Sequence, residues 1–153
     1  LALLRDVITL VVEGERAAVA PLLDLEPTDL PGLLRAGVAA YADVLRADPG
    51  REQGMLELTH LALREPALAG VAQEQYAQYR ALVTEMLVIA ASRTGMRWRM
   101  PAETLARFVV TCMDGLTIGW LVDRDDAALE PQLDMITRAL LEHAEPARTS
   151  TRF

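Results

Sequence analysis

Apolar residues recur every three or four positions along almost the whole sequence, and this pattern restricts the fold more than any other feature. Such spacing is typical of one face of an α-helix. The alternation of apolar and polar residues that indicates a β-strand does not occur. The chain has 153 residues, of which 52% are hydrophobic, so it has the size of one domain with a substantial core. The pattern predicts an all-α fold.

Proline, glycine and capping residues divide this pattern into about six predicted helices. Thr28 or Asp29 can cap one helix start, and Asp48 can cap the next. Pro21 interrupts the first helical pattern, and Gly95 follows the fourth as a C-cap signal. The predicted helices of an antiparallel bundle cover residues 1–20, 30–47, 49–64, 66–94, 101–122 and 127–144. We expect residues 1–146 to form one domain and residues 147–153 to form a flexible tail.

The predicted helix over residues 101–122 is apolar around most of its circumference. A helix of this kind must be buried on more than one side. One side can join the core of a small domain, and the simplest cover for a second side is another subunit. Gly115 and Gly119 are four residues apart and would allow a second helix to approach closely. The sequence therefore predicts a homodimer.

Charge and composition exclude several classes of protein. The formal net charge is −7, so the chain as a whole should be repelled by DNA. Its single cysteine, Cys112, is compatible with a reducing cytoplasm. The longest uninterrupted apolar runs, such as residues 8–12 and 108–113, are much shorter than the roughly 20 residues that span a bilayer. We expect a cytoplasmic chain with no membrane partner.

Residues that could support catalysis or metal binding are too few. Glu57 and His60 form an E-x-x-H sequence, as in helical di-iron sites, but such sites need a second copy, and the other histidine, His143, lies outside such a motif. Cys112 and His60 could be a nucleophile and a base, yet Cys112 lies within an apolar run. We therefore predict no catalytic residues, no metal site and no cofactor.

Several stretches resemble the ligand-binding domain of TetR/AcrR-family transcription regulators. In the last two predicted helices, the similarity lies in Ala106-Arg107, Asp114-Gly115-Leu116 and Leu121-Val122-Asp123. Residues 64–80 resemble the long helix through the ligand-binding core of that family, and residues 1–8 resemble the helix that follows its DNA-binding unit. The resemblance implies that operator DNA is bound only through an N-terminal helix-turn-helix, which we expect this chain to lack.

The resemblance also implies a dimer in which the last two helices of each subunit form a four-helix bundle. The candidate interface residues on these helices are Asp114, Gly115, Ile118, Gly119, Leu133, Ile136 and Leu140. An effector cavity should be mostly apolar with a few hydrogen-bonding groups, so its candidates are polar or polarizable side chains within the apolar stripes. The candidate ligand-binding residues are Met55, Thr59, His60, Tyr76, Tyr79, Met86, Phe108, Thr111 and Cys112.

These observations together predict the effector-binding and dimerisation domain of a TetR-like bacterial regulator, a repressor that senses a small hydrophobic molecule. His60 or Arg64 would suit an anionic group on that molecule. Two alternatives stay open at this point. One is a helical dimerisation module that binds no ligand, and the other is a metal-dependent helical-bundle enzyme.

Overall fold

The described residues form six α-helices and one very short two-stranded sheet. In this computed structural model the described residues are 2–24 and 29–147. The elements in chain order are α1 (Ala2–Asp24), α2 (Leu30–Ala47), α3 (Pro49–Arg64), the 3-10 turn η1 (Pro66–Leu68), α4 (Ala69–Arg93), β1 (Met96–Trp98), α5 (Ala102–Asp123), α6 (Asp126–Leu141) and β2 (Ala144–Pro146). The predicted all-α bundle of about six helices is confirmed.

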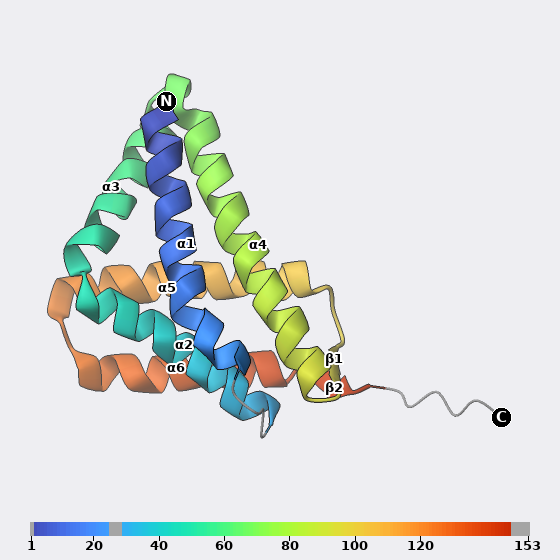
Figure 1. Ribbon diagram of the computed structural model, residues 1–153. Helices are drawn as coiled ribbons and strands as arrows, with labels where there is room; N and C mark the ends of the chain where they lie inside the picture. Colours follow the sequence, from blue (N-terminus) through green and yellow to red (C-terminus); the bar gives the residue numbers. More distant parts are fainter. Residues whose placement is uncertain (1, 25–28, 148–153) are drawn as a thin grey trace.

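The helices are arranged around α4 and α5 (Figure 1). α5 and α6 run antiparallel to each other, while α1 and α4 lie side by side and cross them steeply. α4 packs against α1, α3 and α5, and α2 packs against α1 and α6. Because α1, α2, α3, α4 and α5 all approach the middle of the molecule, side chains from all five can meet there.

The interior contains two clusters of buried apolar side chains. The larger cluster joins α2, α4, α5 and α6, and its most deeply buried members include Ala42, Leu45 and Ala106. The smaller cluster joins α1, α3 and α4 through Ile8 and Val71, with Met55 and Val11. The region between these clusters is where polar side chains enter the interior.

Asp29 and Asp48 cap the N-terminal ends of α2 and α3, at the positions that the sequence predicts. The Asp29 carboxylate accepts a hydrogen bond of 2.6 Å from the backbone N–H of Gly32. Asp48 ends one helix and begins the next: its own N–H donates to the carbonyl of Val44, and its carboxylate accepts from the N–H of Arg51 at 3.0 Å. The predicted bounds of 30–47 and 49–64 are confirmed.

Replacing Asp48 with Ala should lower the free energy of unfolding by about 1 kcal/mol, because the first turn of α3 then loses its capping acceptor. Asp43 is a matched control, since it is an exposed aspartate in α2 whose ion pair with Arg46 is long, at 3.4 Å. Asp43→Ala should change the free energy by less than about 0.5 kcal/mol. Urea unfolding of both variants tests this, and equal losses would contradict the capping role.

Three predicted helix bounds are corrected by the structure. α1 continues through Pro21 to Asp24, where the predicted helix ended near residue 20. Pro21 lies in the last turn, so few helical hydrogen bonds follow it and the interruption is tolerated. α4 begins at Ala69 after η1, and α6 ends at Leu141 rather than near residue 144. Of the predicted tail over residues 147–153, the structure describes only Ala147, whose N–H donates to the carbonyl of Gly95, and residues 148–153 lie outside the described residues.

A fourth correction is the short antiparallel pair of strands β1 and β2. Met96 pairs with Pro146 and Trp98 pairs with Ala144. The indole N–H of Trp98 donates to the carbonyl of Leu87 in α4, so this side chain covers the end of the core. Gly95, at a φ of +67°, makes the turn from α4 into β1. Strands of three residues are too short to show a period-2 pattern, which is why the sequence did not predict them.

α5 is long and apolar enough to cross a membrane by length and composition alone, and 44% of its most apolar 18-residue window is buried. A search for uninterrupted apolar runs does not detect this helix, because Thr111, Asp114 and Thr117 interrupt the runs. The mean hydropathy of the helix is nevertheless high. The core helix of a soluble protein passes the same test. One face of α5 lies in the core, and apolar side chains on another face of the helix are exposed.

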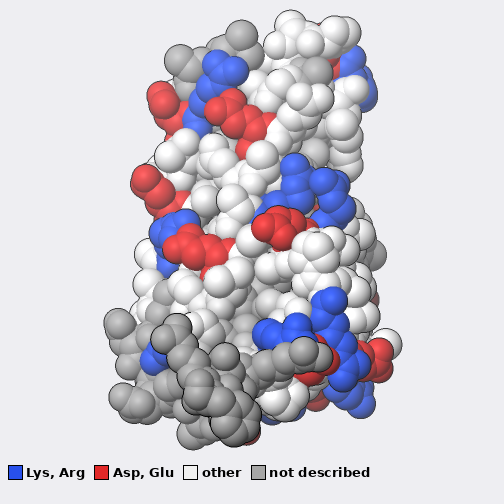
Figure 2. Space-filling model, turned by 90° about the vertical axis from the view of Figure 1, so that its right-hand side faces the viewer, with Lys and Arg blue, Asp and Glu red and all other residues white. Residues whose placement is uncertain are grey.

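Arginines on the surface lie beside acidic side chains. Arg5 pairs with Glu74 at 2.8 Å, and Arg46 contacts both Asp126 and Glu130. On the face shown in Figure 2, positive and negative groups form small mixed clusters separated by uncharged surface. This face therefore lacks the continuous positive patch with which proteins bind nucleic acid.

Candidate functional site

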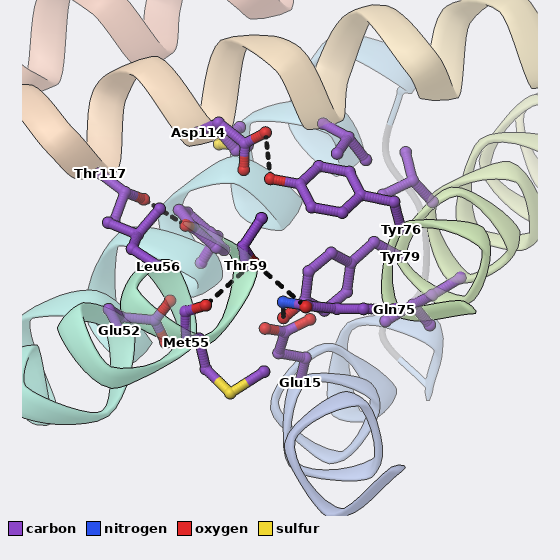
Figure 3. Close-up of a pocket in the computed structure, with 15 residues that line it drawn as sticks. Glu15, Glu52, Met55, Leu56, Thr59, Gln75, Tyr76, Tyr79, Asp114 and Thr117 are labelled. Carbon is purple, nitrogen blue, oxygen red and sulfur yellow. Dashed lines mark hydrogen bonds between the residues drawn. The ribbon is translucent and has the colours of Figure 1, made fainter. Parts of the chain in front are cut away.

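A polar cavity of about 90 Å³ lies where α1 to α5 approach one another. Figure 3 shows Glu15 of α1 on one side, residues of α3 and α4 around it, and Asp114 and Thr117 of α5 on the opposite side. The side chains that line it are Glu15, Tyr41, Glu52, Met55, Leu56, Thr59, Gln75, Tyr76, Tyr79, Leu82, Val83, Val110, Met113, Asp114 and Thr117.

Hydrogen bonds hold one wall of this cavity in place. Thr59 Oγ1 lies 2.9 Å from the carbonyl of Met55 and 3.1 Å from Gln75 Oε1. The amide nitrogen of Gln75 donates to the hydroxyl of Tyr79 at 3.2 Å. Gln75 is only 2% exposed, so these bonds provide partners for a polar group that would otherwise be costly to bury. The wall formed by α3 and α4 is thus preorganised.

Two further hydrogen bonds tie α5 to the opposite wall. The Tyr76 hydroxyl donates to Asp114 Oδ2 at 2.9 Å, and the hydroxyls of Tyr41 and Thr117 form a short hydrogen bond. The ring of Tyr76 meets the ring of Tyr79 edge to face, with centroids 5.8 Å apart. Burial and the neighbouring Asp114 carboxylate raise the pKa of Tyr76 to about 12. Three tyrosine hydroxyls therefore face the cavity in their neutral form.

The cavity is rich in carboxylates. Glu52 is almost fully buried and receives two hydrogen bonds from Arg51, the shorter one at 2.6 Å. Glu15 makes no side-chain hydrogen bond or ion pair with another described residue, and burial beside Glu52 raises its pKa to about 7 despite the nearby Arg51. Burial also raises the pKa of Asp114, against the hydrogen bond from Tyr76. Three acids therefore face one partly compensating guanidinium.

A second, apolar cavity of about 170 Å³ adjoins the first. The two cavities share the side chains of Glu15, Tyr41, Leu82, Val83 and Met113. The other residues that line the apolar cavity are Ala18, Val19, Leu33, Leu34, Gly37, Val38, Ala40, Val44, Met86, Leu87, Ile89, Ala90, Arg93, Val109 and Leu140. Together the two cavities provide a polar end and an apolar end within one interior region.

Five of the nine candidate ligand-binding residues line these cavities. Met55, Thr59, Tyr76 and Tyr79 face the polar cavity, and Met86 faces the apolar one. The helical stripes of α3 and α4 place them there.

The other four candidates lie elsewhere. His60 is exposed, because it follows Thr59 and is turned by about 100° around α3. Phe108 and Thr111 are exposed on α5, where the Thr111 hydroxyl donates to the carbonyl of Arg107. Cys112 is half-buried and packs against the larger core cluster, outside both cavity linings. Arg64, considered for an anionic ligand group, is also exposed and outside the cavities.

The sequence analysis did not select several polar residues that line the polar cavity, although the sequence contains a signal for them. Glu52 shares the buried stripe of α3 with Met55, Thr59 and Ala62. Gln75 similarly lies among the buried residues of α4. Charged or amide side chains at core positions are unusual, and this could have identified them. The lining residues outside the ligand candidates include Glu15, Tyr41, Glu52, Gln75, Asp114 and Thr117.

Part of the candidate dimer face is exposed on α5. Gly115 and Gly119 are exposed, and no atom lies within 4 Å of a Cβ built at either position. Ile118 is 46% exposed between them. Phe108 and Val122 are exposed nearby on the same helix, so α5 has an outward apolar stripe.

The other candidate interface residues lie inside the subunit. Asp114 faces the polar cavity, where it accepts the hydrogen bond from Tyr76. Leu133, Ile136 and Leu140 of α6 belong to the larger core cluster and are at most 6% exposed. The buried apolar stripe of α6 therefore packs on its own chain in this structure.

The E-x-x-H sequence does not assemble a metal site in the described part of the chain. Residues 2–24 and 29–147 contain no group of three or more histidine, cysteine, aspartate or glutamate side chains that could hold a metal ion. Glu57 instead accepts a hydrogen bond from Gln53, one turn earlier on the surface of α3.

Adjoining cavities that are mostly apolar with a few hydrogen-bonding groups have the character of small-molecule binding sites. The family model for the C-terminal domain of BetI-type transcriptional repressors matches residues 32–145. The chain therefore belongs to this family of TetR-type repressor C-terminal domains. Comparisons with curated proteins and with solved structures found no significant match.

Proposed function

We propose that this chain is the effector-binding and dimerisation domain of a cytoplasmic repressor, and that it binds a small amphipathic or hydrophobic molecule in the two adjoining cavities. The observation that carries the proposal is an interior space bounded by five helices, with hydrogen-bonding groups at one end and aliphatic side chains at the other. Effector sites commonly have this mixture. Family membership supports a regulatory rather than an enzymatic role.

Binding in these cavities would act on α1. Glu15 lines both cavities, and Ala18 and Val19 line the apolar one. In the family that the chain resembles, this helix follows the DNA-binding unit, so its tilt would set the spacing of two recognition helices in a dimer. These helices must lie about 34–36 Å apart to engage both half-sites. The effector would release DNA by binding more tightly to the form with a different spacing.

The outward stripe of α5 supports the proposed dimer. Ile118, Phe108 and Val122 would be covered by the same stripe of a second subunit, with Gly115 and Gly119 allowing close approach of the helices. A self-complementary contact of this type fits the two-fold symmetry of most homodimers. The proposed bundle would contain α5 and α6 of both subunits.

Placing a large side chain on the wall that the two cavities share should weaken ligand binding. Val83 lines both cavities, so Val83→Trp should weaken binding of the neutral fluorophore N-phenyl-1-naphthylamine by about tenfold or more, because its ring would occupy the space. Val88, on the same helix and 50% exposed, is the matched control. Fluorescence titration measures both affinities, and circular dichroism checks that both variants keep their helices.

Two results would contradict the proposed site. The unmodified domain could give no saturable fluorescence increase, which would favour a dimerisation module without a ligand. Alternatively, Val83→Trp and Val88→Trp could bind the fluorophore equally well, which would place the binding site outside the cavities.

A further inference from the structure

The two cavities differ sharply in chemistry although they share a wall. The polar cavity contains carboxylates from three helices, namely Glu15 of α1, Glu52 of α3 and Asp114 of α5. The apolar cavity is lined almost entirely by aliphatic and aromatic groups beyond the shared Glu15 and the terminal Arg93 of α4. Any molecule that fills both must have one polar end and one apolar end, and the carboxylates determine which polar end is acceptable.

The polar cavity offers acceptors and negative charge in excess of donors. The guanidinium of Arg51 already donates two hydrogen bonds to Glu52. The hydroxyl of Tyr76 is directed to Asp114, and Tyr41 and Tyr79 are hydrogen-bonded to Thr117 and Gln75. Glu15 has no hydrogen-bonded partner among the described residues. A group that brings both N–H donors and positive charge would satisfy these carboxylates.

We propose that the effector is an amphipathic amine, whose protonated nitrogen lies among Glu15, Glu52 and Asp114 in the polar cavity and whose hydrocarbon part lies in the apolar cavity. This inference rests on the proposed function, because it names the ligand class of the same site. It replaces the sequence-based idea of an anionic ligand group, since His60 and Arg64 lie outside both cavities.

An anionic amphiphile fits the same space poorly. Its head in the polar cavity would face three carboxylates in a region of low dielectric constant. The cationic side chain among the residues that line the two cavities is Arg93, ten residues beyond Val83 and therefore about 15 Å further along α4. An anion held there would place its chain in the apolar cavity and leave the three carboxylates of the polar cavity without a partner from the ligand.

The protonation state of Glu15 provides a second, independent signal. Its carboxyl, with a pKa of about 7, faces Glu52 and Arg51 of α3 and Tyr79 of α4, while Tyr41 of α2 and Asp114 of α5 line the same cavity. A cation beside this carboxyl lowers its pKa. Binding of an ammonium group at pH 7 therefore displaces about half a proton from Glu15, and binding of an uncharged ligand does not.

Four ligands with the same eight-carbon chain separate the contributions of charge and hydrogen bonding. Isothermal titration calorimetry at pH 7 would compare octylamine, octan-1-ol, octanoate and octyltrimethylammonium, in two buffers of different ionisation enthalpy. We expect octylamine to bind about tenfold or more tightly than each of the others and to release about half a proton. In Glu15→Gln this advantage over octan-1-ol should shrink severalfold and the proton release should disappear. Glu13→Gln, on the exposed side of α1, should behave like the unmodified domain.

Each other outcome overturns a stated part of the proposal. If octan-1-ol or octyltrimethylammonium binds as tightly as octylamine, an ammonium with N–H donors is not what the site selects. If octanoate binds most tightly, the head group belongs at Arg93. In these cases, loss of N-phenyl-1-naphthylamine binding in Val83→Trp would still support the proposed function. If neither the fluorophore nor any of the four ligands binds, both proposals fail.

Discussion

Replacing Glu15 with Gln is expected to stabilise the ligand-free domain by about 3 kcal/mol at pH 8, and by less than about 1 kcal/mol at pH 5. Burial and the adjacent Glu52 raise the pKa of this carboxyl from 4.5 to about 7 in the folded state. The folded protein therefore binds the proton more tightly than the unfolded chain. Each pKa unit corresponds to about 1.36 kcal/mol, which gives the size of the effect.

The sign of the pH dependence follows from the raised pKa. Below about pH 4.5, Glu15 is protonated in both states and its burial costs little. Between about pH 4.5 and 7 the unfolded chain ionises first, so stability falls, and above pH 7 the full cost is present. Glutamine resembles the protonated acid and lacks this cost.

Urea unfolding at pH 5 and pH 8, at one protein concentration, measures the difference. Glu13→Gln is the control, because Glu13 lies on the same helix but is exposed. If Glu15→Gln gave the same small change at both pH values, or if it destabilised the protein at pH 8, the carboxyl would not be buried in this way.

Replacing Ile118 with Asp should convert the proposed dimer into a folded monomer. In a two-fold contact through α5, this substitution would place two carboxylates, one from each subunit, in an apolar interface. Neither carboxylate would have a positively charged partner. We expect the dimer dissociation constant to rise about 100-fold or more. In the separate subunit, Ile118 is 46% exposed, so the aspartate should be tolerated there.

Leu61→Asp is the matched control, since Leu61 is 47% exposed but lies on α3. Sedimentation velocity over a range of concentrations would follow both variants, with circular dichroism to check helix content. If the unmodified chain sediments as a monomer at all accessible concentrations, the proposal of a dimer is wrong. Equal dissociation in both variants would show that the contact does not pass through α5.

Much of the fold could be predicted because its signals are local. Asp48 followed by a proline is sufficient to indicate the junction of α2 and α3, since a capping carboxylate needs only a nearby backbone N–H. The end of α1 could not be predicted in this way. A proline in the last turn costs less than one in the middle, and where the last turn falls depends on packing.

The candidate site could be predicted only where it follows a helical stripe. Thr59 and Tyr79 lie on apolar stripes, and the structure places both at the cavity. Glu15 and Asp114 come from helices far apart in the sequence, and their placement on opposite sides of one cavity depends on how α1 and α5 both pack on α4. The apolar stripe of α6 shows a different limit of sequence prediction. Such a stripe does not reveal whether it packs against its own chain or against a second subunit.

The pairing of β1 with β2 limits how far the helices on either side of it can move. Beyond the paired strands, the N–H of Arg99 donates to the carbonyl of His143, and the N–H of Ala147 donates to the carbonyl of Gly95. These hydrogen bonds join the C-terminal end of α6 to the C-terminal end of α4. The arrangement of α4, α5 and α6 is therefore held by backbone hydrogen bonds as well as by side-chain packing. α1 precedes α2 and α3 in the chain and meets α4 through side-chain contacts such as the ion pairs of Arg5 with Glu74 and Arg16 with Glu85, so displacing α1 should cost less free energy. If the cavities bind an effector as proposed, we expect α1 to move relative to α4, α5 and α6, which keep their arrangement.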